Sequence, residues 1–153
     1  MMTQVLGALV SVALVVGGQS TAKVNFSGEW KMNTMKSDFG ALPPPEFITR
    51  TITHEEPALT IVESQRSAMG DQNATRKYRT DGTDTTFDSN GVTVAGNAKW
   101  AEGALVVTSK VDTIGLNFID TMSLSPDGKT LTSKVRINSP QGDLDVTIVF
   151  EKQ

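Results

Sequence analysis

The chain has 153 residues, 17 acidic and 14 basic side chains, a net charge of −3 and no cysteine. The length suits one domain. A weak negative charge without a basic run gives no electrostatic footprint for nucleic acid or for anionic lipid. The missing cysteines exclude disulfides and thiolate metal sites. We therefore expect a domain that is stabilised by its own closed core.

The first 22 residues form an apolar leader. Its run from Val5 to Val16 is shorter than the roughly 20 residues that cross a bilayer, and it has the length of the apolar region of a signal peptide. Ser20-Thr21-Ala22 supplies small residues for cleavage, although no Lys or Arg precedes the run. We predict a signal peptide over 1–22 and an exported domain over 23–153, periplasmic or secreted. A leader that stays attached as an anchor is the alternative.

After the leader, period-two alternation and turn sequences predict β-strands, and no stretch has a helical period beyond a turn or two. Short links such as Asp81-Gly82 and Pro126-Asp127-Gly128 favour antiparallel neighbours. Ten strands are predicted, over 26–32, 47–54, 58–66, 73–80, 83–88, 92–100, 104–111, 114–124, 129–138 and 143–151.

The later strands have one apolar face, here called the dry face, and one polar face that is exposed to solvent. In the strand 114–124, the apolar residues Ile114, Leu116, Phe118, Met122 and Leu124 share one face. A sheet of this kind must cover its dry face, and without helices it closes on itself or folds into two packed sheets. We predict an all-β fold, an antiparallel up-and-down meander of about ten strands closed into a barrel.

One link, over 33–46, is much longer than the others. Pro43-Pro44-Pro45 makes its exit stiff and extended, and Ser37-Asp38-Phe39-Gly40 predicts a single helical turn before it. Long loops at a barrel end often act as lids. A loop that only covers the end of the barrel is the alternative.

The motif Phe26-x-Gly28-x-Trp30-Lys31 in the first predicted strand resembles the first-strand signature of the calycins, which include lipocalins and fatty-acid-binding proteins. The segment 90–107 and the last strand, which ends on Phe-Glu-Lys, look more like the fatty-acid-binding branch. The resemblance implies a barrel with an internal cavity for a small apolar or amphipathic molecule. Export is closer to the lipocalins.

The resemblance also implies a plug at one end of the barrel, made by Phe26, Gly28 and Trp30. Glycine permits a close approach or a sharp bend of the strand, and a large aromatic side chain on the same face seals the end. In this family the tryptophan packs near a basic residue of the last strand. Lys152 is the candidate for that position.

The sequence departs from the family where fatty-acid-binding proteins hold the ligand carboxylate. Their Arg-x-Tyr pair on the last strand matches Ile148 and Phe150 here, and a second inward arginine falls near Asp120 or Thr121. The link 33–46 is also too short for the helix-turn-helix lid. The resemblance therefore implies the barrel but not the anchor for a fatty acid.

Polar side chains in phase with apolar faces mark candidate ligand contacts. Asp120 interrupts an apolar face and needs a partner, for which Arg50 or Arg76 is suitable. A structural ion pair, or a bulge that turns Asp120 outward, is the alternative. The candidate ligand-binding residues are Arg76, Tyr78, Ser109, Phe118, Asp120, Ser133, Ile148 and Phe150.

Motifs for catalysis or for a cofactor are not found. His54 is the only histidine, and beside Glu55 and Glu56 at a strand end we expect it to be exposed, although a lone histidine inside a barrel also admits haem binding as a minor alternative. Neither a nucleophile elbow nor metal-ligand spacing accompanies it. We predict a monomeric carrier without cofactor or metal. A packed barrel acting as an interaction protein, and an enzyme using the inner polar residues, remain the alternatives.

Overall fold

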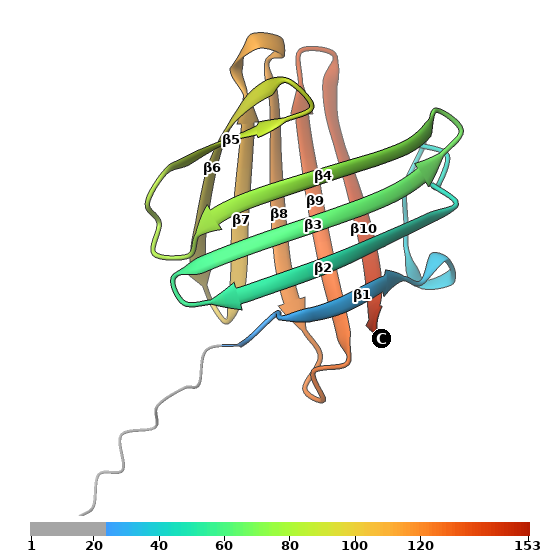
Figure 1. Cartoon of the computed structure of the whole chain (residues 1–153). Helices are drawn as coiled ribbons and strands as arrows, with labels where there is room; N and C mark the ends of the chain where they lie inside the picture. The colour runs from blue at the N-terminus through green and yellow to red at the C-terminus, as the bar shows by residue number, and fades with distance from the viewer. Residues whose placement is uncertain (1–23) are drawn as a thin grey trace, which may run out of the picture.

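The structure, a computed structural model, describes residues 24–153 and is all-β (Figure 1). The predicted leader lies outside the described residues, so export stays a prediction. All ten predicted strands are present, with shifted ends. They are β1 Gly28–Met32, β2 Phe47–Glu55, β3 Ala58–Ser67, β4 Gly70–Arg79, β5 Thr85–Ser89, β6 Val92–Ala101, β7 Ala104–Val111, β8 Leu116–Leu124, β9 Thr130–Ser139 and β10 Gly142–Lys152.

The strands form one antiparallel sheet in the order β4-β3-β2-β1-β10-β9-β8-β7-β6-β5. Each strand pairs with its neighbour in sequence except β4 and β5, and β1 pairs with β10 through Trp30 and Lys152. In Figure 1 the strands β1–β4 run in front of β7–β10 and cross them. The sheet is thus a nearly closed barrel with one seam between β4 and β5, where Thr85 Oγ1 donates a hydrogen bond to the carbonyl of Lys77 at 3.0 Å.

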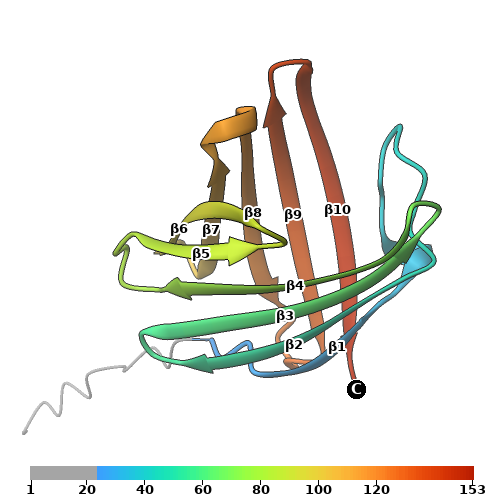
Figure 2. The ribbon, with the colours of Figure 1, turned by 45° about the horizontal axis from the view of Figure 1, so that its top comes forward.

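The link between β1 and β2 follows the edge of β10 before it crosses the barrel end. Its helical turn is a 3-10 turn over Thr34–Lys36, so the prediction of a turn at 37–40 was wrong. The side chain of Asn33 accepts a hydrogen bond from the Lys36 backbone and thereby starts the turn early. Asp38 is then held extended by a β-bridge to Thr147. Figure 2 shows this link standing beside the β3–β4 turn.

The start of β8 also differs from the prediction. A 3-10 turn occupies Asp112–Ile114, and Gly115 ends it with a left-handed φ of 64°. Ile114 is therefore 57% exposed, outside the dry face to which the alternation assigned it. Within residues 24–153, both helices are single 3-10 turns, and neither is long and apolar enough to cross a membrane.

Candidate functional site

The barrel encloses a cavity of about 350 Å³. Its wall is formed by β2–β4 on one side, by β7–β10 on the other, and by the link 33–46 at its mouth. Six of the eight predicted ligand-binding residues line it: Arg76, Tyr78, Ser109, Phe118, Asp120 and Ile148. The other two, Ser133 and Phe150, are fully buried and are not among its lining residues, and contact of all eight with a ligand stays a prediction.

A charged network crosses one wall of the cavity. Arg50 Nε donates to Glu63 Oε2 at 2.5 Å, and Arg76 Nη2 donates to the same oxygen at 3.1 Å. Arg50 Nη1 lies 3.5 Å from Asp120 Oδ2. The network joins β2, β3, β4 and β8. Because Arg50 is only 3% exposed, its surroundings have a low dielectric constant.

Asp120 points inward, as the sequence predicted. It stands in unbroken register opposite Val107 on β7 and Val135 on β9, so the alternative of a bulge was wrong. Ser133 Oγ donates a short hydrogen bond to Asp120 and accepts one from Arg50 Nη1 at 3.1 Å. Behind this group the Arg50 guanidinium lies 4.5 Å from the ring centre of Phe150, a cation–π contact. Ser133 and Phe150 thus position Arg50 and Asp120.

Two hydroxyl groups form a second polar pair in the cavity wall. Tyr78 Oη and Ser109 Oγ are 2.6 Å apart and join β4 to β7 across the interior. Burial raises the pKa of the Tyr78 hydroxyl, so it stays neutral and can donate. Gly96 on β6 makes room for the ring, because a Cβ at that position would lie 2.9 Å from it.

Glu63 is the important residue that the sequence analysis missed. Its phase with Leu59 and Ile61 on β3 was the available signal, since all three side chains face inward. Burial alone would raise the pKa of Glu63, but the guanidinium groups of Arg50 and Arg76 lower it to about 2. The lining residues of the link 33–46, Phe39, Leu42, Pro43 and Pro45, were also not named in advance.

We expect Glu63 to make folding stability depend on acid pH. Its folded-state pKa of about 2 lies below its ordinary 4.5, so its contribution is complete above pH 4.5 and is lost as pH falls toward 2. The size is on the order of 3 kcal/mol. Urea unfolding of the wild type and of Glu63→Gln between pH 7 and pH 2 measures it. The two stability curves should converge toward pH 2, and a constant gap would contradict the prediction.

The opposite end of the barrel holds the predicted plug. Trp30 is 1% exposed, and its Nε1 donates to the Phe26 carbonyl at 3.0 Å. Lys152 Nζ lies 5.7 Å from the centre of the Trp30 ring, so the contact expected from the resemblance is present. Gly28 has a φ of +143°, and a Cβ there would lie 3.0 Å from Lys152 Cε. Both facts favour glycine at this position.

His54 belongs to this plug, and the prediction that it is exposed was wrong. The ring is 3% exposed and stacks on Phe26 and Trp100 at centroid distances of 5.8 and 5.9 Å. Its Nδ1 accepts a hydrogen bond from the Phe26 backbone, and its Nε2 lies 2.8 Å from Glu56 Oε1. Both ring nitrogens are engaged, which argues against iron binding. Within residues 24–153 no group of His, Cys, Asp and Glu is arranged to hold a metal.

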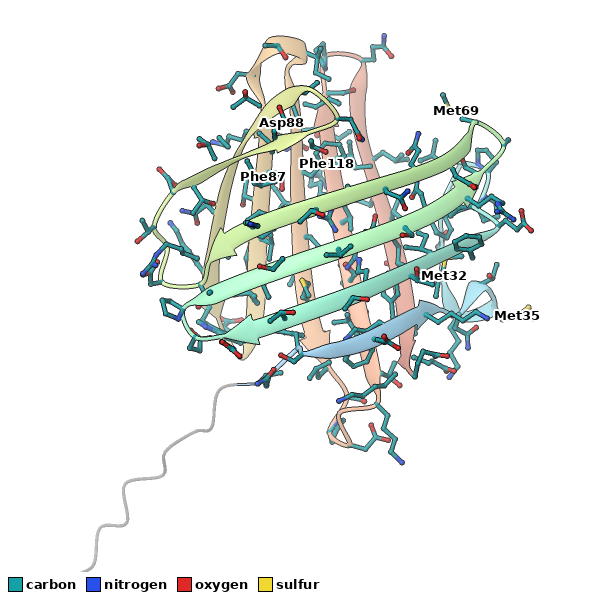
Figure 3. The ribbon with its side chains drawn as sticks, viewed as in Figure 1. Met32, Met35, Met69, Phe87, Asp88 and Phe118 are labelled. Carbon is teal, nitrogen blue, oxygen red and sulfur yellow. The ribbon has the colours of Figure 1, made fainter. Side chains whose placement is uncertain are left out.

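A second, more apolar hollow of about 320 Å³ adjoins the cavity. It shares Arg76, Ser109 and Phe118 with the cavity wall and reaches Phe87 on β5. Figure 3 shows Phe87 and Phe118 near the space between β4 and β5. The seam of the barrel therefore has apolar side chains behind it.

Comparison with family models finds no match, and neither does comparison with curated proteins. Solved structures do match. Secretory abundant heat soluble protein 4 from Ramazzottius varieornatus is similar with a TM-score of 0.62 at 14% identity, over 89% of this chain and 99% of that one. The zebrafish ileal bile acid-binding protein with cholic acid is similar with a TM-score of 0.58 at 14% identity, over 84% of this chain and 98% of that one. Lipid binding protein 8 of Caenorhabditis elegans is similar with a TM-score of 0.61 at 12% identity, over 84% of this chain and 95% of that one.

These likenesses show the fold. The chain folds as a ten-stranded up-and-down β-barrel like those of these solved structures, as its first strand and its meander predicted. The cavity also carries an Arg-x-Tyr pair, Arg76 and Tyr78, but on β4 instead of the last strand. Because Arg76 is bonded to Glu63 and Tyr78 to Ser109, the pair is built into the wall.

Proposed function

We propose that the protein binds a small apolar or amphipathic molecule inside its barrel. The observation that carries the proposal is the cavity of about 350 Å³, whose mostly apolar wall carries a charged network and a pair of hydroxyl groups. Sites for small molecules are concave, mostly apolar, and fixed by a few polar groups, with volumes of about 300–1,000 Å³. Structural neighbours named for bile acid and lipid binding support it.

The cavity favours a carrier over the two alternatives. A barrel that serves only as an interaction module fills its interior with side chains to the density of a core. An enzyme using the inner residues needs groups that exchange protons near neutral pH. Glu63 has a pKa of about 2, and burial raises the pKa of Tyr78, so neither of these groups is suited to that role.

Filling the cavity should abolish binding. We expect the uncharged fluorescent dye Nile red to bind the wild-type protein saturably, and the variant Ile137→Trp to weaken it at least tenfold. Ile137 lines the cavity, and a larger side chain there occupies the space of the ligand. Lys134→Trp, on the exposed face of the same strand, is the matched control. Fluorescence titration that finds no saturable binding, or an equal effect of both variants, would contradict the proposal.

A further inference from the structure

The polar residues of the cavity carry balanced charges. Arg50 and Arg76 provide two positive charges, and Glu63 and Asp120 provide two negative ones. All four line the same cavity. With both carboxylates ionised, the sum is zero before any ligand enters.

The guanidinium groups are already engaged by the carboxylates of the chain itself. Arg50 uses Nε on Glu63 and Nη1 on Asp120 and Ser133. Arg76 uses Nη2 on Glu63. The charge of an entering carboxylate would lie beside the charges of Glu63 and Asp120 in a site of low dielectric. A carboxylate head is therefore disfavoured.

Donors without an acceptor remain in the same wall. Within residues 24–153, Arg76 Nε is buried and has no hydrogen-bond partner. Tyr78 and Ser109 hold two hydroxyl protons between them but share one hydrogen bond, so one proton is left to donate. Buried donors are normally satisfied, and one that is not lowers stability. A ligand oxygen that accepts hydrogen bonds from these groups would satisfy the unpaired donors without adding charge.

We propose that the cavity selects uncharged amphiphiles whose polar end carries an acceptor oxygen, such as an ester or an amide, over free carboxylates. This inference rests on the binding function proposed above. The acceptor oxygen lies against Arg76 and the Tyr78–Ser109 pair. The apolar tail lies among the aliphatic side chains that line the rest of the cavity, among them Ile48, Val107, Val146 and Ile148.

The test compares three head groups on the same acyl chain. Laurate, lauramide and methyl laurate displace Nile red from the delipidated full chain at pH 7.5, where laurate is ionised. We expect the amide and the ester to bind at least tenfold more tightly than laurate. Laurate binding as tightly as either, or more tightly, would overturn the selectivity while leaving cavity binding in place. Failure of Nile red itself to bind saturably would instead overturn the proposed function.

Removing one carboxylate should change the preference. In Glu63→Gln two guanidinium groups face a single carboxylate, so we expect laurate affinity to rise at least tenfold and methyl laurate affinity to change less than threefold. Asp120→Asn should act in the same direction and replaces Glu63→Gln if that variant does not fold. Glu29→Gln, on the exposed face of β1, is the control and should match the wild type. Unchanged laurate affinity in a folded Glu63 or Asp120 variant would refute the role of charge balance.

Discussion

Replacing Arg50 with methionine is expected to lower the free energy of unfolding by about 3–5 kcal/mol. The change removes the cation that contacts both Glu63 and Asp120, and among residues 24–153 it leaves these two carboxylates of the cavity wall with the guanidinium of Arg76 as their remaining cation. Methionine keeps much of the side-chain volume over Phe150, so the loss reports charge more than packing. Urea denaturation at pH 7 measures it.

A matched control separates this effect from the loss of any salt bridge. Arg136→Met on β9 also breaks two ion pairs, to Asp143 and Asp145, but its side chain is 50% exposed. Exposed pairs contribute about 0–1 kcal/mol, so this variant should stay near the wild type. Adding Glu63→Gln to Arg50→Met should restore part of the stability, because it removes a carboxylate that lacks a partner. Equal losses for Arg50 and Arg136 would show that the buried network does not stabilise the fold.

The strands and their order followed from local signals. Alternation gave the inward face of each strand, and turn sequences gave the links, because both act within a few residues. Ile114 departed from its face where Gly115 allowed a left-handed turn and a 3-10 turn formed ahead of β8. Asn33 similarly moved the turn of the link 33–46 by capping it early. Single residues set the positions of these two 3-10 turns, and an alternation pattern does not reveal them.

The site required more than local signals. Arg50 meets Glu63 as its direct partner across the β2–β3 hairpin, but Asp120 lies 70 residues away, so the contact of Arg50 with Asp120 depends on closure of the barrel. Asp120 and Arg50 were identified because each broke an apolar face. Glu63 interrupts one too, but its strand continues into the polar residues Gln65 and Ser67, so alternation alone does not decide which face of β3 points inward there. His54 was misjudged because its burial depends on Phe26 and Trp100, distant residues that stack on it.

One end of the barrel is packed with side chains, and the other holds the cavity. At the plug, the rings of Phe26, His54 and Trp100 stack on one another, and the polar atoms of Trp30 and His54 are hydrogen-bonded. At the other end, side chains from the link 33–46 cover a cavity without filling it. A rigid plug stabilises a barrel whose opposite end holds open space, since the cavity itself contributes fewer packing contacts. Stability and binding should therefore respond to different residues.

Trp30→Ala tests this separation and should lower the free energy of unfolding by about 3–5 kcal/mol, the range for removing a large buried aromatic side chain. The variant loses the packing of the indole, its hydrogen bond to Phe26 and its contact with Lys152. Trp30→Phe keeps most of the ring area and should cost less. In the folded variants Nile red affinity should change less than threefold, because Trp30 is not among the residues that line the cavity. A loss of dye binding without a loss of stability would instead make Trp30 part of the ligand site.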